Sequence, residues 1–339
     1  MRRPSGAAVT ERVASSPQQF LRVAILYLVM ITVACANGGE GSVATPSRTT
    51  SIVDAWTMRA EAPLALTEVA AAAYDGRIWV AGGMDGDGRA VTAVQIYDPA
   101  LDSWARGPEL PEPLHHSTLV ATDDTLYLVG GYMGSSFRDP TAAVRRLDPA
   151  QRAWRDGPAL PSPRAAGAGA WDGQRVVYGG GVGPGGLAGD LFVLDGGSWA
   201  RLGELSRPRE HLAAASDGQG QVWLLGGREG SLETNLAVVD LVAGSSVRAL
   251  GALPTPRGGV AAFWSAATGA CLVGGERSSG TLTEVECIDA AGHLTTLPPL
   301  GVPRHGLGAA VVEGTAYVLL GGPRPGLAVS PVVEALPLT

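Results

Sequence analysis

The sequence predicts an all-β fold, a six-bladed β-propeller with four antiparallel strands in each blade. An apolar strand that ends in Gly-Gly recurs six times, with the first glycine at 82, 130, 179, 226, 274 and 321. The spacing of 47 to 49 residues indicates a repeat fold. The 48 glycines and 24 prolines suit many short strands joined by tight turns. Hydrophobic residues make up 45% of the 339 residues and charged residues 17%, which argues against disorder.

The N-terminus has the pattern of an export signal. Four arginines precede an uncharged apolar run over residues 23–34, which has the length of a signal-peptide core and is short for a membrane span. The run ends in ITVACANGGEG, which resembles a bacterial lipoprotein signal with Cys35 as the lipid-accepting residue, although Thr32 stands where leucine is usual. The alternative is cleavage by the ordinary signal peptidase after Ala36 and free secretion.

We therefore expect three segments. Residues 1–36 are the signal peptide, residues 37–50 are a small, polar and flexible tether, and residues 51–339 are the propeller. The folded domain is expected in the cell envelope, attached to a membrane only through the lipid, or in the medium if the chain is freely secreted.

Each unit repeats the same order of signals. A Pro-Arg or Pro-Leu turn precedes a first apolar strand, as in PRAAGAGAW, and a short turn leads to the strand that ends in Gly-Gly. A variable loop and a strand ending near aspartate follow. In the first three units an Asp-Pro or Asp-Gly turn comes next, and Trp104, Trp154 or Trp199 opens the fourth strand. Units four and five lack this tryptophan, with VDLVAGSSV and IDAAGHL at the equivalent place.

The Gly-Gly pair is predicted to be a packing device. Where the backbone leaves the second strand, a side chain would collide with the neighbouring sheet or with a bulky fourth-strand residue, whereas glycine has no Cβ and accepts positive φ. The glycine-rich stretch GGGVGPGG at residues 179–186 has the same explanation, because it lacks the GK[ST] ending and the following helix of a phosphate loop.

These features resemble the kelch repeat, with its double glycine, its Tyr-Asp-Pro-like turn and a tryptophan at set offsets, over about residues 52–337. The resemblance implies blades arranged around a central channel. Because the chain ends soon after the third strand of the last blade, a fourth strand must come from elsewhere. We expect the N-terminal strand at about 52–58, which carries Trp56, to pair with residues 331–336 and close the ring.

Function is expected at one mouth of the channel. The loops between the second and third strands and the turns between blades should lie there together. They supply the candidate ligand-binding residues Arg164, Arg209, Glu210, His211, Arg257, Arg304, His305, His115, His116, Arg228 and Glu276, and Glu68 occupies the corresponding turn of the first blade. Converging guanidinium groups suit a carboxylate or polyhydroxy ligand. The alternative is that each arginine supports its own loop by bonding carbonyls of the next blade.

Cysteine and histidine spacing limits other chemistry. Cys271 and Cys287 lie in the second and third strands of the fifth blade, so that either a disulfide or two buried thiols remain open. The absence of a CxxC pair and the scattering of the five histidines predict no metal site, and we expect no cofactor.

The expected function is that of an exported, noncatalytic binding or scaffold module for a glycan, peptide or protein, acting as a monomer. The net charge of −7 disfavours nucleic acid as a partner. The resemblance also extends to enzymes. Sialic-acid mutarotases are six-bladed kelch propellers that act by acid and base near the channel, and Glu210, with Arg209, Arg257 and Arg304, is the candidate for such a site. Copper-radical oxidases resembling galactose oxidase need a Cys-linked tyrosine, a second tyrosine and two histidines. That activity is disfavoured, because both domain cysteines lie in strands and no tyrosine adjoins a histidine.

Overall fold

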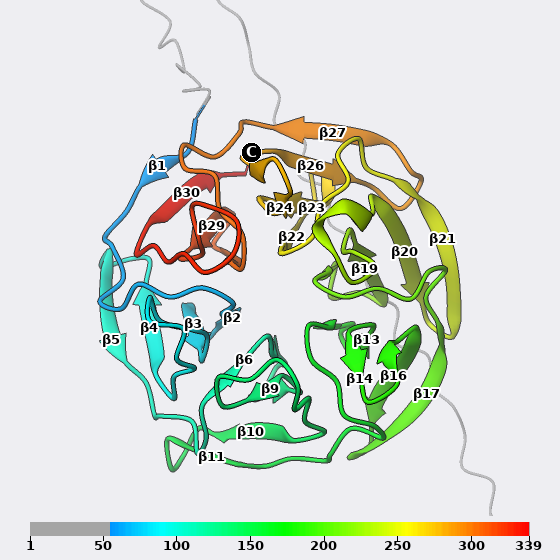
Figure 1. The fold of residues 1–339 in the computed structure, drawn as a ribbon, viewed down its shortest axis with the longest axis horizontal. Coiled ribbons are helices and arrows are strands. Elements are labelled where there is room, and N and C mark those ends of the chain that lie inside the picture. Colours follow the sequence, from blue (N-terminus) through cyan, green and yellow to red (C-terminus); the bar gives the residue numbers. More distant parts are fainter. Residues whose placement is uncertain (1–54, 339) are drawn as a thin grey trace, which may run out of the picture. The chain divides into compact units, whose positions relative to one another are not determined.

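The computed structural model describes residues 55–338, which form six four-stranded antiparallel sheets around a central channel (Figure 1). This confirms the predicted six-bladed propeller. The expected signal peptide (1–36), Cys35, the tether (37–50) and the first residues of the closing strand lie outside the described residues. No helix within residues 55–338 is long and apolar enough to cross a membrane.

Each blade runs from an inner strand at the channel to an outer strand at the rim. Blade 1 consists of β2 (Ala70–Tyr74), β3 (Arg77–Ala81), β4 (Val94–Asp98) and β5 (Ser103–Arg106). Blade 2 consists of β7 (Thr118–Ala121), β8 (Leu126–Val129), β10 (Val144–Asp148) and β11 (Ala153–Asp156). Blade 3 consists of β12 (Ala168–Trp171), β13 (Val176–Gly179), β16 (Asp190–Asp195) and β17 (Ser198–Glu204).

The other three blades repeat this plan. Blade 4 consists of β18 (Ala213–Ser216), β19 (Gln221–Leu225), β20 (Val238–Ala243) and β21 (Ser246–Ala252). Blade 5 consists of β22 (Ala261–Ser265), β23 (Gly269–Val273), β26 (Val285–Ile288) and β27 (Leu294–Leu297). Blade 6 consists of β28 (Gly308–Val312), β29 (Thr315–Leu319), β30 (Val333–Pro337) and β1 (Thr57–Met58).

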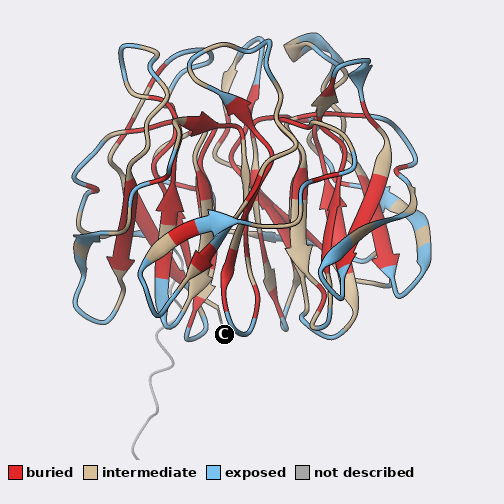
Figure 2. Cartoon of the chain, turned by 90° about the horizontal axis from the view of Figure 1, so that it is seen from below, coloured by how far each residue is buried: buried red, intermediate tan, exposed pale blue. Residues whose placement is uncertain are grey.

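Short strand pairs and one 3₁₀ helix lie in the loops. The pairs are β6 (Leu114–His115) with β9 (Tyr132–Met133), β14 (Val182–Gly183) with β15 (Gly186–Leu187), and β24 (Glu276–Arg277) with β25 (Gly280–Thr281), and the loop after β19 contains the 3₁₀ helix η1 (Leu232–Thr234). The hydrophobic core lies between neighbouring blades. Figure 2 shows buried strand residues in the middle of the propeller and exposed loops at both faces.

The Gly-Gly pairs pack against the backbone of the next blade, as the sequence predicts. In blade 5, Gly274 has a φ of 63°, and a Cβ there would lie 2.6 Å from the carbonyl oxygen of Arg304, in the turn that enters blade 6. The N–H of Gly275 donates to the same oxygen at 2.8 Å. The glycines therefore bring two backbone segments of neighbouring blades so close that no side chain fits between them.

The register of this pair differs from the sequence alignment in two blades. In blade 3 the pair is formed by Gly180 and Gly181, both with positive φ, whereas Gly179 still belongs to β13. In blade 6 the positive-φ residues are Leu320 and Gly321. The backbone position of the pair is set by the hydrogen bond to the neighbouring turn, which Gly181 and Gly321 donate, and not by the first glycine of the sequence motif.

The N-terminal strand closes the ring. Residues 57 and 58 in β1 pair with residues 335 and 334 in β30, which confirms the expected pairing over the described part of that strand (Figure 1). Trp56 donates from Nε1 to the carbonyl oxygen of Pro298 at 2.7 Å, beside the neighbouring blade 5. Trp104, Trp154 and Trp199 make the same kind of bond, to the carbonyl oxygens of Ala60, Pro108 and Pro158. The tryptophans thus join adjacent blades at the rim.

Cys271 and Cys287 face each other directly across β23 and β26 and are joined by a disulfide. Both residues are fully buried in the core between blades 5 and 6. Of the two alternatives that the sequence left open, the structure has the cross-strand bond.

Substitutions at two separate glycines, Gly274 and Gly134, test the packing role. Gly274→Ala is expected to destabilise the protein by about 2–4 kcal/mol, because the new Cβ meets the Arg304 carbonyl in a left-handed conformation. Gly134 has a similar φ of 65° but nothing within 4 Å of its added Cβ, so Gly134→Ala should cost only about 1 kcal/mol. Urea unfolding measures both values. Equal losses would contradict the packing argument.

Thiol counting tests the disulfide. In a Cys35→Ala variant, denatured without reductant, we expect no reactive thiol, and two after reduction. Reduction of the folded protein should lower its stability by about 3 kcal/mol, as expected for a closed loop of this length. Two reactive thiols before reduction would show that the bond does not form.

Candidate functional site at the channel mouth

A three-residue turn enters each blade, and we call these segments the inter-blade tripeptides. They are residues 66–68, 114–116, 164–166, 209–211, 257–259 and 304–306. In each, the middle residue pairs with a residue that follows the double glycine of the same blade, as Glu210 pairs with Arg228 and His305 with Gly322. The turns between blades and the loops after Gly-Gly therefore share one face, as the sequence predicts.

The third residue of each tripeptide faces the channel axis and has positive φ, between 53° and 65°. These residues are Glu68, His116, Ala166, His211, Gly259 and Gly306. These third residues are joined by backbone hydrogen bonds of 2.8 to 3.3 Å. The N–H of each one, beginning with His116 and ending with Gly306, donates to the carbonyl oxygen of the third residue of the preceding tripeptide. The N–H of Val69 closes the circle on the carbonyl of Gly306 at 3.3 Å.

This backbone ring separates two spaces. Below it, the inner strands line a channel cavity of about 510 Å³, mostly with alanine and glycine. Above it lies a pocket of about 290 Å³, which we call the mouth pocket. Its walls come from the ring and from the loops, namely Thr67, Glu68, Met84, Gly88, His116, Ser135, Phe137, His211, Arg228, Glu276, His305, Gly326 and Leu327.

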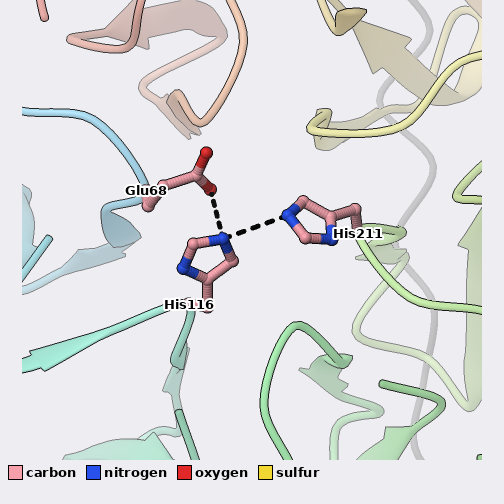
Figure 3. A group of neighbouring side chains, drawn as sticks. All are labelled: Glu68, His116 and His211. Atoms are coloured by element: carbon pink, nitrogen blue, oxygen red, sulfur yellow. Dashed lines mark hydrogen bonds and ion pairs between the residues drawn. The ribbon is translucent and has the colours of Figure 1, made fainter. Parts of the chain in front are cut away.

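Three ring positions carry functional side chains that turn toward one another (Figure 3). Nε2 of His116 lies 3.2 Å from Oε2 of Glu68 and 3.0 Å from Nε2 of His211. The three ligand-type atoms all lie within 4.8 Å of one another. The remaining ring positions hold Ala166, Gly259 and Gly306.

Each histidine is held by a neighbour on its other nitrogen. Nδ1 of His211 bonds to Glu210, the preceding residue. Nδ1 of His116 lies 2.6 Å from Nδ1 of His115, whose Nε2 is 3.3 Å from the carbonyl oxygen of Ser136. Because both ring orientations are fixed in this way, the two Nε2 atoms face the same point.

Arg228 is the cation of the cluster. It donates to Oε1 of Glu210 at 2.8 Å, to Oε1 of Glu276 at 2.9 Å and to Nε2 of His211 at 3.0 Å. His305 lies between two carboxylates, 3.7 Å from oxygens of both Glu68 and Glu276. The cluster thus holds three carboxylates, from Glu68, Glu210 and Glu276, and one guanidinium, so acidic groups are in excess.

Protonation follows from this environment. Burial would raise the pKa of Glu68, but the surrounding histidines and Arg228 lower that pKa to about 2. Burial would also raise the pKa of Glu210, and its bonds to His211 and Arg228 lower it to about 2. Burial lowers the pKa of His116 to about 3 against the opposing pull of Glu68. At neutral pH both carboxylates are therefore ionised, and His116 is neutral.

The structure brings together seven of the predicted ligand-binding residues. They are His115, His116, Glu210, His211, Arg228, Glu276 and His305. Glu210 contacts one arginine, Arg228, and does not meet the three arginines that the mutarotase-like hypothesis placed around it. Both its carboxylate oxygens are engaged, by Arg228 and by His211.

The four arginines that follow proline do not converge on the channel, which corrects the sequence expectation. Arg209, Arg257 and Arg304 are fully buried inside their own blades, and Arg164 is 6% exposed. Arg209 donates to the carbonyls of Gly226 and Leu224 and to Asp240 at 2.8 Å. The first residue of each tripeptide points into the blade, so these arginines support the fold. The alternative interpretation had this structural role but placed the carbonyl partners in the next blade, whereas Arg209 bonds carbonyls of its own blade.

Local spacing in the sequence does not reveal the cluster at the ring. Glu68, His116 and His211 come from blades 1, 2 and 4, and no motif joins them in the sequence. Their shared signal is their equivalent place in three copies of a 48-residue unit. Phe137 and Leu327, the exposed apolar residues of the mouth pocket, lie in variable loops that carry no such signal.

Removing a blade arginine tests its structural role. Arg304→Ala leaves Glu334, its partner at 2.6 Å, as an unpaired charge in the blade interior, and we expect a loss of about 3–5 kcal/mol. Arg201 pairs with Asp190 and Glu204 at the surface with its side chain 52% exposed, so Arg201→Ala should cost less than about 1 kcal/mol. Denaturant unfolding gives both values. A small loss for Arg304→Ala would show that the buried pair is dispensable.

Comparison with known proteins gives consistent results. The kelch motif model matches residues 65–111 and 113–161, which are blades 1 and 2. Kelch-like protein terF of Aspergillus terreus is 28% identical over 300 residues, which cover 84% of this chain and 55% of terF. Alpha-scruin of Limulus polyphemus is 28% identical over 210 residues, or 61% of this chain and 18% of the scruin. The chain spans about half the length of terF.

A solved structure shows the same fold over most of the chain. The structure of YjhT superposes with a TM-score of 0.66 at 17% sequence identity and covers 81% of this chain and 96% of its own. At this identity the likeness concerns the fold.

Proposed function

We propose that this kelch-repeat protein is an exported, noncatalytic binding module that takes the end of a neutral or amino-substituted glycan in its mouth pocket. The observation that carries the proposal is the composition of that pocket. Its volume is about 290 Å³, and its lining combines the buried acceptors of Glu68 and Glu276 with the exposed apolar side chains of Phe137 and Leu327. Export is supported by the signal-peptide pattern of residues 1–36 and attachment by Cys35, with free secretion as the alternative.

The chemistry of the pocket fits a sugar ring. Hydroxyl groups are donors, and Glu68 and Glu276 offer carboxylate oxygens as acceptors. Phe137 is 56% exposed beside the pocket, and its ring face suits the apolar C–H face of a sugar. The charge of the cluster also decides which charged ligands are favoured. Because the cluster has three carboxylates against one guanidinium, an amino group is favoured and an acidic sugar is disfavoured.

A second candidate function is acid–base catalysis on the same ligand class, as in anomer exchange. The observation that favours it is the Glu210–His211 pair, in which a buried carboxylate orients the imidazole of a residue that lines the mouth pocket. His211 would be the acid–base group and Glu210 its positioning residue. Copper-radical chemistry stays disfavoured, because Cys271 and Cys287 are joined to each other and neither can link to a tyrosine.

A thermal-shift screen of the purified full chain tests ligand binding, with neutral, amino and acidic sugars compared in the presence of a chelator. A ligand that binds only the folded protein adds about 2.7 kcal/mol of stability at a hundredfold excess over its dissociation constant. We expect a saturable shift from a neutral or amino sugar that Phe137→Ala abolishes. Leu101→Ala removes an exposed side chain on an outer turn of blade 1 and should leave the shift intact.

Two outcomes would contradict the binding proposal. One is a shift from acidic sugars alone, and the other is a shift that survives Phe137→Ala. The catalytic alternative is tested by measuring anomer exchange of any sugar that binds. Loss of exchange with retained binding in His211→Gln would support catalysis, whereas unchanged exchange would remove it.

A further inference from the structure

We propose that Glu68, His116 and His211 form a binding site for one divalent transition-metal ion of the Zn²⁺ class at the centre of the backbone ring. The three side chains come from three different blades and point at one another (Figure 3). Oε2 of Glu68 and Nε2 of His211 lie 3.2 and 3.0 Å from Nε2 of His116. The site does not depend on the proposed glycan binding, since its ligand atoms belong to the protein alone.

The hydrogen-bond network assigns the protons on His116. The carbonyl oxygen of Ser136 can only accept, so Nε2 of His115 carries the proton and Nδ1 of His115 is an acceptor. Nδ1 of His116 must therefore donate to Nδ1 of His115, at 2.6 Å. This tautomer leaves a lone pair on Nε2 of His116, directed at Glu68 and His211.

The same reasoning applies to His211. Glu210 accepts a hydrogen bond from Arg228 on one carboxylate oxygen and meets Nδ1 of His211 with the other, so Nδ1 of His211 is the donor and carries the proton. Arg228 donates to Nε2 of His211 at 3.0 Å, which requires a lone pair there. Three lone pairs, on two imidazoles and one carboxylate, consequently converge. No proton then lies between Nε2 of His116 and either Glu68 or His211, so these lone pairs repel one another. A cation bound between them would replace the repulsion by attraction.

The geometry and donor set fit a metal of this class. Bonds of 2.0–2.1 Å in tetrahedral coordination place ligand atoms about 3.3 Å apart, close to the two separations at His116. Two histidines and one glutamate form a ligand set known for catalytic zinc, with the fourth position open. Calcium and magnesium prefer oxygen ligands, so the imidazoles select against them. Glu210 and His115 supply the second-layer hydrogen bonds that fix ligating imidazoles.

The surroundings favour a cation, with one exception. The side chains of Glu68, His116 and His211 are only 14%, 3% and 9% exposed, and three carboxylates face one guanidinium. Arg228 opposes binding, because its guanidinium occupies the lone pair of His211. Metal binding must displace that one hydrogen bond, while the bonds of Arg228 to Glu210 and Glu276 can remain. Removing Arg228 should therefore strengthen metal binding.

The test is Zn²⁺ binding by the full chain, purified without a histidine tag, stripped with a chelator and dialysed. Equilibrium dialysis with metal analysis should give one Zn²⁺ per chain. His116→Gln and His211→Gln should each weaken binding at least 100-fold. His293→Gln is the matched control, because His293 lies at the rim of blade 5 with its side chain 81% exposed, and its Zn²⁺ binding should equal that of the wild type.

Two conservative variants keep the test informative if a histidine variant does not fold. Glu68→Gln should weaken binding at least tenfold, and Arg228→Gln should strengthen it at least tenfold. Zn²⁺ should also raise the melting temperature of the wild type and of Arg228→Gln. The proposal is overturned if the wild type binds no stoichiometric Zn²⁺, or if Glu68→Gln and Arg228→Gln bind as the wild type does. The sugar screen is run in chelator, so failure there and failure here are separate results.

Discussion

The structure depends on one hydrogen bond that is repeated six times, from the second residue of each double-glycine position to the carbonyl of the next blade's tripeptide. Examples are Gly83 to Leu114, Gly227 to Arg257 and Gly321 to Leu66, at 2.8 to 2.9 Å. In five blades the first residue of the pair is a glycine whose added Cβ would lie 2.4 to 2.9 Å from that same carbonyl oxygen, and in blade 6 this place is taken by Leu320, with a φ of 61°. This bond fixes the position and direction of every tripeptide, and the last one joins blade 6 to blade 1.

A tripeptide fixed in this way assigns a direction to each of its residues. The first points into the blade, the middle one toward the loops, and the third toward the axis. Arginine at the first place therefore meets an acid on the third strand, as with Asp240, Glu286 and Glu334. Histidine or glutamate at the second and third places meets its equivalents from other blades. One short segment thus supplies both the buried ion pairs of the fold and the polar groups of the mouth pocket.

The sequence was sufficient to predict the ring of blades but only part of the candidate site. A period near 48 residues, the glycine pairs and Trp56 were enough to predict six blades and the closing strand, because these signals reflect contacts repeated in every blade. The direction of side chains within a tripeptide is set by backbone angles that no residue type reveals. Arg209, Glu210 and His211 are consecutive and looked alike as ligand groups, yet Arg209 is buried in its blade while the other two join the cluster. Glu68 was visible only as the equivalent of His116.

The glycine at position 306 leaves room for Glu68 in the ring. Gly306 has a φ of 58°, and a Cβ there would lie 2.5 Å from Oγ1 of Thr67 and 2.7 Å from the backbone N of Glu68. A side chain at this position would thus push against the turn that carries Glu68. At the same joint the ring is closed by the N–H of Val69, one residue later than the pattern of the other blades. The seam between the last blade and the first is therefore the place where the ring departs from its repeat, and the glycine on one side of that seam leaves the space in which Glu68 meets His116.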